Sequence, residues 1–262
     1  MTFDLSEFSL GDMLQCGLEL RQRMRGAPTM EAAANSVVRY LYDNCRERSS
    51  GQRECSLVRF YKTHPYGELD PMLQLFARVR LGEVQPSADM RCLTLLATVG
   101  DEPSWCSRHH SKGHRAIPLA SARAVEQAPM IAQLVREFGL DISNVVQPST
   151  DIVRDLEGKT YGVFHVEEAQ GSGYIPAQAD FVAAYGIASV VGFGGSLRTG
   201  ELFAVILFSR VHVPRESADR FRSVALDVKA AVFPFGRNQV FSSSRSPDIE
   251  LASPPEAPRP EA

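Results

Sequence analysis

Two apolar segments joined by a glycine-flanked loop constrain the fold of this chain most. Residues 188–193 and 202–208 are short and rich in valine and phenylalanine, and the loop 194–200 separates them. A connection of this length suits two antiparallel neighbours, because parallel strands need a crossover of a dozen or more residues. We therefore expect a β-hairpin here, within an antiparallel sheet.

Helical patterns precede and follow this hairpin. Residues 30–45 carry apolar side chains three and four positions apart, and Thr29 is the expected N-cap. Residues 129–138 and the segment from Pro214 to residue 232 show the same periodicity, each with a proline at its start. Further helices are expected at 13–24, 71–79 and 176–186, and further strands at 55–62, 90–99 and 162–166. Helices mixed with hairpin strands favour an α+β fold with a mostly antiparallel sheet.

The chain divides into three parts by composition. Its 262 residues correspond to one or two domains. Residues 1–50 are expected to form helices that pack on a domain of residues 51–235. Residues 236–262 hold five of the sixteen prolines and a serine cluster, so we expect this tail to be disordered.

Composition also restricts the classes of protein. A net charge of −3 leaves no overall basic surface for nucleic acid. The five cysteines include no closely spaced pair, which is typical of a reduced, cytosolic protein. The N-terminus lacks a signal-peptide pattern, and no apolar run approaches the roughly 20 residues of a membrane helix. We therefore expect a cytoplasmic protein that binds neither membrane nor nucleic acid.

The order of elements resembles the GAF fold, a relative of the PAS domains. The resemblance spans residues 30–235 and is carried by AAANSVVRYLYD, by the strand CSLVRFYK, by residues 187–208 with the run SVVGFGGSLRTGELFAVILF, and by the helix after Pro214. It implies about six antiparallel strands flanked by N- and C-terminal helices, with those helices together on one face. It also implies a small molecule held between the sheet and the helices of one face, and dimerisation through flanking helices.

The chain departs from the ligand-defined GAF groups. Residues 71–119 form a long polar insert, and we find neither a bilin-attachment cysteine nor the signature of cyclic-nucleotide-binding members. The resemblance therefore implies sensing or scaffolding, with the ligand and any cofactor unknown. A GAF-type enzyme, free methionine-(R)-sulfoxide reductase, is an alternative because Cys92 and Cys106 lie in this insert, although the cysteine spacing differs from the one expected.

The segment 105–115 is the most unusual in composition. Its cationic side chains predict a site for a small anionic ligand, with the candidates Arg108, His109, His110 and His114. A second hypothesis is zinc, because Cys106, His110 and His114 follow a C-x3-H-x3-H spacing. The third is an exposed basic loop that serves only solubility.

A second polar segment, residues 161–185, contributes further candidates. His165 lies beside Glu167 and Glu168, and Tyr174 and Tyr185 follow. We predict His165, Tyr174 and Tyr185 as ligand-binding residues. A histidine near two carboxylates also permits acid–base chemistry, and a capped helix with an ordinary loop is the alternative.

Nucleotide and hydrolase motifs are absent from the sequence. The glycines at 192, 194 and 195 do not complete a dinucleotide fingerprint, since Leu197 stands where the third glycine belongs. We expect them to shape a hairpin or a bulge.

These observations favour a non-enzymatic bacterial regulatory protein. It is expected to bind a small ligand or a partner signalling protein in trans and to relay the change through its flanking helices. A redox enzyme or a zinc-binding sensor is the alternative. A homodimer is expected through residues 30–42 and 218–232, whose apolar stripes are broad.

Overall fold

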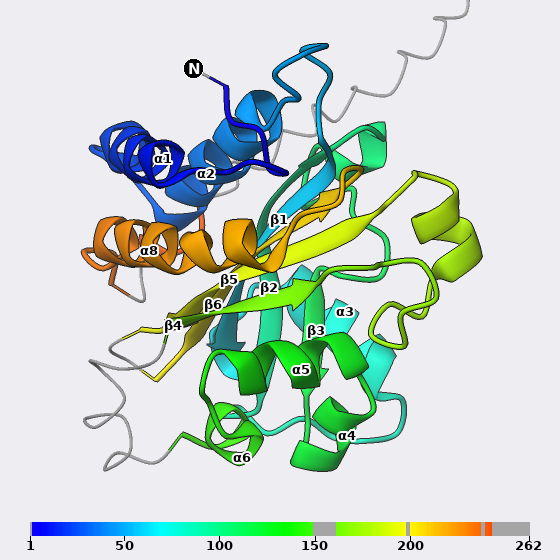
Figure 1. Ribbon diagram of the computed structural model, residues 1–262. Coiled ribbons are helices and arrows are strands. Elements are labelled where there is room, and N and C mark those ends of the chain that lie inside the picture. Colours follow the sequence, from blue (N-terminus) through cyan, green and yellow to red (C-terminus); the bar gives the residue numbers. More distant parts are fainter. Residues whose placement is uncertain (1, 149–160, 198–199, 237–238, 243–262) are drawn as a thin grey trace, which may run out of the picture.

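The computed structural model describes residues 2–148, 161–197, 200–236 and 239–242. A six-stranded antiparallel sheet in the order β3-β2-β1-β6-β5-β4 forms its centre (Figure 1). The strands are β1 (Cys55–Pro65), β2 (Arg91–Gly100), β3 (Ala116–Leu119), β4 (Tyr161–Val166), β5 (Ser189–Ser196) and β6 (Leu202–Ser209). The predicted hairpin is confirmed, since β5 and β6 pair from Ser189↔Ser209 to Ser196↔Leu202.

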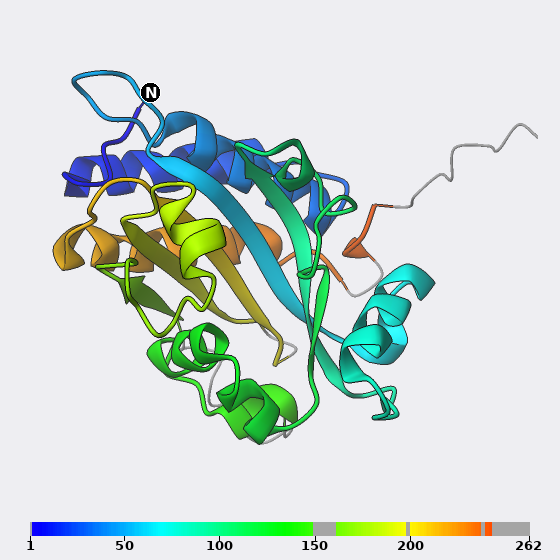
Figure 2. The ribbon, with the colours of Figure 1, turned by 90° about the vertical axis from the view of Figure 1, so that its right-hand side faces the viewer.

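Helices cover both faces of the sheet (Figures 1 and 2). One face, here the helix-bundle face, packs against α1 (Leu10–Met24), α2 (Met30–Asn44) and α8 (Arg215–Val232). The other, here the α5 face, is covered by α4 (Ala122–Glu126), α5 (Pro129–Glu137), α6 (Ile142–Val146) and the π-helix η3 (Gln178–Ala183). The helix α3 (Pro71–Leu81) lies beside β3. The short helices η1 (Tyr66–Glu68) and η2 (Pro103–Trp105) are the remaining elements of the described residues.

Local sequence explains where most helices begin. The Thr29 side chain accepts the Ala32 N–H as predicted, and Asp70 caps α3 in the same way. Gly139 has a φ of +72° just after α5, the left-handed conformation that ends helices. The expected helix over 176–186 is instead the single π-helical turn of η3, and the short α4 and α6 were not predicted.

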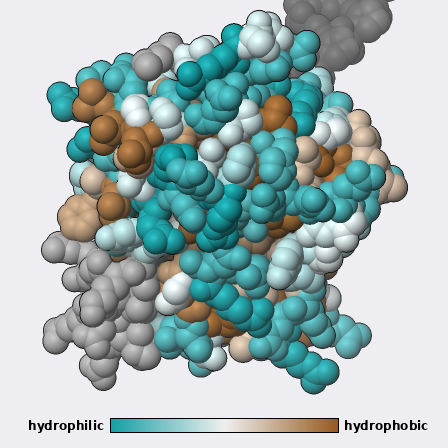
Figure 3. Space-filling model, in the orientation of Figure 1, coloured by the Kyte–Doolittle hydropathy of each residue, from teal (hydrophilic) through white to brown (hydrophobic). Residues whose placement is uncertain are grey.

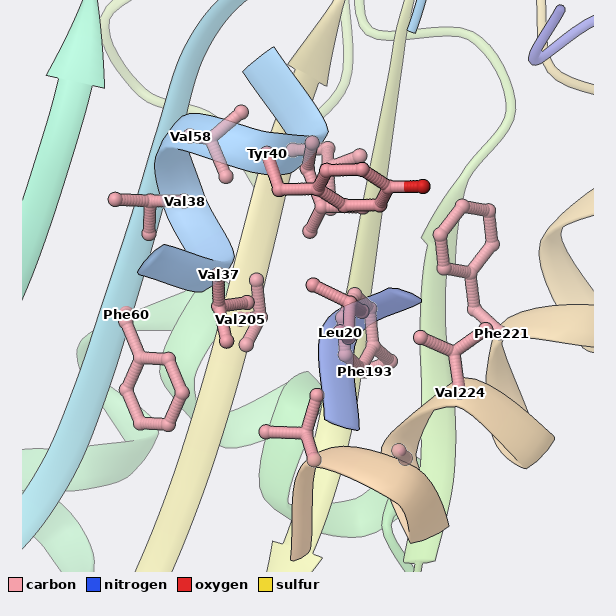
Figure 4. Close-up of a cluster of buried hydrophobic side chains, with 14 of the residues drawn as sticks. Leu20, Val37, Val38, Tyr40, Val58, Phe60, Phe193, Val205, Phe221 and Val224 are labelled. Atoms are coloured by element: carbon pink, nitrogen blue, oxygen red, sulfur yellow. The ribbon is translucent and has the colours of Figure 1, made fainter. Parts of the chain in front are cut away.

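The helix-bundle face holds the larger hydrophobic core (Figure 4). Leu20 of α1, Val37 of α2 and Phe193 of β5 meet there with Phe221 of α8. Phe221 stacks on Phe8 with ring centroids 4.6 Å apart. The N- and C-terminal helices therefore share one core with the sheet, and α2, including most of residues 30–42, is buried within it.

Glycines on β4 and β5 let α5 approach its face closely. A Cβ on Gly162 would lie 2.2 Å from the Glu137 carbonyl oxygen, and one on Gly194 would lie 2.9 Å from the Phe138 ring. The described β5–β6 pairing is continuous in register. The glycines of β5 therefore belong to the hairpin, one of the two predicted alternatives, and form no bulge with β6. Gly162 and Gly194 also make room for the end of α5.

The first residues of the tail contact the folded chain. The Val240 carbonyl accepts the Glu31 N–H, and Phe241 packs on His64 with ring centroids 5.0 Å apart. The predicted disorder is therefore not seen at residues 239–242, because Val240 and Phe241 supply apolar side chains that pack. Residues 237–238 and 243–262, which the prediction also covers, lie outside the described residues.

Glu54 ties the N-terminal segment to the sheet and predicts a pH-dependent stability. Its buried carboxyl accepts the Leu5 N–H at 2.8 Å and lies beside Asp4. Burial raises the pKa of Glu54 to about 8, and the negative charge of Asp4 adds to the rise. The native state thus holds a proton at neutral pH that the unfolded state releases above its own, lower pKa.

The free energy of unfolding is therefore expected to fall as pH rises from about 5 to about 8, by on the order of 3 kcal/mol. Urea denaturation at several pH values measures this fall. Glu54→Gln keeps both hydrogen-bonding groups but cannot ionise, so its stability should vary much less over the same window. Equal pH slopes for the two proteins would contradict the assignment.

Candidate functional site

The predicted cationic patch is divided by the structure. Arg108 is buried and forms a two-pronged ion pair with Glu31, with Nε–Oε1 2.7 Å and Nη2–Oε2 3.2 Å. Its guanidinium also lies over the Phe241 ring, 5.2 Å from the centroid. Arg108 therefore links the loop after β2 to the start of α2 and already has its anion.

The three histidines of that segment do not share one environment. His109 and His110 are exposed, on a turn in which His110 N–H donates to the Ser107 carbonyl. Part of His114 is also exposed, yet the surrounding protein still desolvates its ring. This desolvation and then the charge of Arg59 lower the pKa of His114 to about 4. The positive charge of Arg59 thus lies close enough to His114 to lower its pKa.

The predicted zinc ligands do not form a metal site. Among the described residues, no three His, Cys, Asp or Glu side chains form a group able to hold a metal ion, so Cys106, His110 and His114 do not converge. The Cys106 thiol instead contacts the Gly100 and Glu102 carbonyl oxygens at 3.3 and 3.5 Å. Burial raises the pKa of Cys92 to about 12, which keeps its thiol protonated and unsuited to attack as a thiolate.

The other predicted ligand-binding residues, His165, Tyr174 and Tyr185, also lie in different environments. His165 Nε2 lies 2.9 Å from the carbonyl oxygen of Val213, in the segment between β6 and α8, rather than in an acid–base pair. Burial lowers the pKa of His165. Tyr174 lies edge-on to Phe164 of the α5 face. Tyr185 packs on Trp105 at 4.5 Å and hydrogen-bonds through its hydroxyl to Glu102.

An arginine that the sequence analysis passed over is the most unusual group on the α5 face. Arg59 lies in the middle of β1 between Leu57 and Tyr61, which both point to that face. Only 8% of the residue is exposed. Its Nη1 is 3.4 Å from the Tyr61 hydroxyl, a long contact, and its Nε has no hydrogen-bond partner. Within the described ranges, no carboxylate pairs with it.

The other buried cations of the described residues, unlike Arg59, have carboxylate partners. The described residues contain four buried cationic side chains of Lys or Arg: Arg59, Lys62, Arg91 and Arg108. Lys62 pairs with Glu201 at 3.1 Å, Arg91 lies 3.7 Å from the same carboxylate, and Arg108 pairs with Glu31. A buried charge without a partner is strongly unfavourable. Arg59 is therefore the buried cation that still requires an anion.

Strand pairing places a second unsatisfied group beside it. Thr98 of β2 and Ile206 of β6 are the register partners of Arg59, so the three side chains form one row across the α5 face. The Thr98 hydroxyl is buried and has no hydrogen-bond partner. Arg59, Thr98 and the Tyr61 hydroxyl thus provide donors for one anionic group. We call these three residues the Arg59 cluster.

An aromatic cluster adjoins this row at one end of the sheet. Phe208, the register partner of Leu57, packs edge-on against Phe181 at 5.0 Å, and Phe181 contacts Trp105 at 5.7 Å. Leu57 is two residues from Arg59, a separation of about 7 Å along a strand. Tyr185, predicted from the sequence, belongs to this aromatic cluster. The arrangement combines a cationic head with an apolar surround, which suits an organic anion.

One sequence signal pointed to Arg59. It is the single charged residue in the run SLVRFY, in which apolar side chains predict burial on both faces of the strand. A charge within a doubly buried strand requires a partner, and the sequence names none. Thr98 carries no comparable signal, since threonine is common in strands.

The arrangement of strands and helices meets the expectation from the family resemblance. Six antiparallel strands carry the N- and C-terminal helices together on one face. The fold is GAF-like. No protein-family model matches the chain, and no curated protein matches it significantly.

Solved structures with a similar fold include GAF domains. One belongs to a phosphoenolpyruvate-protein phosphotransferase from Coxiella burnetii: it is 13% identical, covers 84% of this chain and 92% of that chain, and has a TM-score of 0.43. The phycocyanobilin-bound GAF domain of a cyanobacterial phytochrome is 12% identical over 85% and 94%, with a TM-score of 0.43. The N-acylhomoserine-lactone-dependent LuxR-family factor CepR2 from Burkholderia cenocepacia is 14% identical over 85% and 96%, with a TM-score of 0.37.

The sequence predicted no membrane-spanning helix, and the lengths and polarity of the helices test this prediction. In the part of the chain that the structure covers, none of the helices combines the length and apolar character that crossing a bilayer requires.

Proposed function

We propose that this chain is a non-enzymatic regulatory protein that binds a small organic anion at the Arg59 cluster. The observation that carries the proposal is the buried Arg59 guanidinium, which lacks a carboxylate partner among the described residues. A carboxylate or phosphate group between Arg59 and Thr98 would neutralise the charge and satisfy both groups. The apolar part of the ligand would then contact the aromatic cluster of Trp105, Phe181, Tyr185 and Phe208.

The position of Arg59 on β1 suggests how binding is transmitted. Its strand neighbours Val58 and Phe60 point to the opposite face and pack in the core with α2. A ligand that binds one arrangement of β1 more tightly will shift the population of that arrangement. The change would reach α2 and, through the shared core, α1 and α8, where a partner signalling protein would respond.

Trp105 makes the proposal directly testable, because it is the single tryptophan of the chain and lies in the aromatic cluster. The probes are acetate, inorganic phosphate and phenylacetate, with neutral phenylacetamide as the matched control for phenylacetate. We expect a saturable change in tryptophan fluorescence with phenylacetate and binding at least about tenfold weaker with phenylacetamide, because a charge-assisted hydrogen bond is lost.

Arg59→Met should abolish this preference for the anion, and Thr98→Val should weaken it. Leu75→Met on the outside of α3 is a matched surface control and should bind as the wild type does. If none of the three anions affects the fluorescence or the thermal unfolding midpoint, or if Arg59→Met binds phenylacetate normally, the proposal is wrong.

The Arg59→Met variant is expected to be more stable than the wild type in the absence of ligand. Methionine has a similar length and no charge, so Arg59→Met removes a desolvation cost and should raise the free energy of unfolding by about 1–3 kcal/mol. Urea denaturation in a buffer free of small carboxylates and phosphate measures this. A decrease would mean that Arg59 is satisfied in the free protein and is part of its structure.

A further inference from the structure

A carboxylate whose charge is not balanced lies beside the aromatic cluster. Glu102 Oε1 accepts a hydrogen bond from the Tyr185 hydroxyl at 3.1 Å. Within the ranges that the structure describes, no lysine, arginine or histidine forms an ion pair with Glu102. Its neighbour Asp101, by contrast, pairs with Arg210 and accepts the Tyr42 hydroxyl. The aromatic cluster therefore has an unbalanced acid next to it, in addition to the unbalanced base on β1.

Trp105 lies between Glu102 and the Arg59 cluster along the sheet. Gly100 follows Thr98 by two residues on β2, so both positions are on the α5 face, about 7 Å apart. A Cβ on Gly100 would lie 2.8 Å from Cε3 of Trp105, so the indole ring rests on this glycine. Glu102 follows Gly100 by two residues, beyond the end of β2. The chain thus runs from the Arg59 cluster, past the tryptophan, to the carboxylate.

The rings beside Glu102 suit a cation. Tyr185 packs on Trp105 with centroids 4.5 Å apart, and Phe181 lies 5.9 Å from Tyr185. The face of an aromatic ring attracts an ammonium group, and a carboxylate nearby adds to that attraction. Desolvation and then the hydrogen-bonded Glu102 raise the pKa of Tyr185, as expected where the local potential is negative. This end of the site therefore favours positive charge, whereas the Arg59 end favours negative charge.

The aromatic cluster and Glu102 border the solvent. Glu102, Trp105, Phe181 and Tyr185 are each half-buried, whereas Arg59 is buried. The turn of η3 is yellow-green at the right of Figure 1, and Figure 3 shows hydrophilic and hydrophobic residues side by side in that region. A ligand would therefore enter past these residues, with its anionic group leading toward Arg59.

We infer that the ligand of this site is a zwitterion, with its anionic group at the Arg59 cluster and an ammonium group held by Glu102 and the rings of Trp105 and Tyr185. The inference rests on the proposed function, because it takes the anion site at Arg59 as given, and it adds the class of ligand. A simple carboxylate leaves Glu102 unbalanced, and a simple amine leaves Arg59 unbalanced. A molecule with both charges, separated by an apolar body of at least about 7 Å, balances the two.

Three probes test the charge arrangement by tryptophan fluorescence of the full chain. Phenylacetate carries only the carboxylate, 4-(aminomethyl)phenylacetate adds an ammonium group across the ring, and phenylglycine places its ammonium group next to the carboxylate. We expect 4-(aminomethyl)phenylacetate to bind at least about fivefold more tightly than phenylacetate, from one cation–π contact and one partly exposed ion pair. Phenylglycine should bind more weakly than phenylacetate, because its ammonium group would lie beside Arg59.

Glu102→Gln tests the role of the carboxylate. Glutamine keeps the size of the side chain and an oxygen for the Tyr185 hydroxyl but removes the charge. This variant should lose most of the preference for 4-(aminomethyl)phenylacetate and should bind phenylacetate at least as tightly as the wild type does. Glu83→Gln, at an exposed position after α3, is the matched control and should keep the preference of the wild type.

The outcomes separate this inference from the proposed function. If phenylacetate binds but 4-(aminomethyl)phenylacetate binds no more tightly, the ligand is a simple anion, so the inference is wrong and the proposed function stands. A preference that Glu102→Gln retains in full overturns the inference in the same way. If none of the three probes binds, the proposed function is wrong and this inference is wrong with it.

Discussion

Gly162→Ala is expected to lower the free energy of unfolding by at least about 3 kcal/mol. The new Cβ would lie 2.2 Å from the Glu137 carbonyl oxygen and 2.7 Å from the Phe138 Cα, both of them backbone atoms. No side-chain rotation relieves such an overlap. The strand β4 and the end of α5 must move apart, and Phe138 then loses its packing against the sheet.

Urea denaturation of the purified variant measures this loss. Gly173→Ala is the matched control, because a Cβ there meets no atom within 4 Å and its φ is not in the left-handed region. It should change the free energy of unfolding by less than about 0.5 kcal/mol. If Gly162→Ala is as stable as Gly173→Ala, then α5 does not rest on β4 in solution.

Glu31→Ala is expected to lower the free energy of unfolding by about 3–5 kcal/mol, because it leaves the buried Arg108 without its carboxylate. Glu31 also accepts the Ser242 N–H at 3.0 Å, so its loss should free the first residues of the tail. Chemical denaturation gives the free energy, and limited proteolysis reports the release of the tail.

A double-mutant cycle distinguishes the ion pair from simple loss of packing. The double variant Arg108→Met/Glu31→Ala lacks both charges, so it should be less destabilised than the single variant Glu31→Ala. Glu126→Ala breaks the exposed contact of Glu126 with Arg136 at 3.9 Å and should cost less than about 0.5 kcal/mol. A double variant no more stable than the single one would contradict a dominant role for the charge.

The same pair shows what sequence reasoning missed about Arg108. A run of arginine and histidine predicted an anion site at residues 108–114, but Arg108 found Glu31, 77 residues away in the chain. Sequence spacing indicates which charges are neighbours along a loop. It does not indicate which of them the folded chain has already neutralised.

Arg59 shows the opposite case. A single arginine within an apolar strand drew less attention than a cluster of six cations and histidines, yet it is the buried cation left without a counter-charge in the described structure. Tyr185, which the sequence predicted as a ligand-binding residue, lies in the aromatic cluster beside this row. The role of these residues in binding remains a proposal.

Periodicity, caps and turn residues determined the parts of this protein that depend on neighbours within about ten positions. The hairpin at β5 and β6, the helices α2, α5 and α8 and the antiparallel α+β class follow from such patterns, because helices and hairpins form from local hydrogen bonds. Tertiary structure alone decided which charges are paired and which glycines carry α5. Those properties depend on strand register and helix packing between segments far apart in sequence, as when β1, β2 and β6 align Arg59, Thr98 and Ile206 in one row.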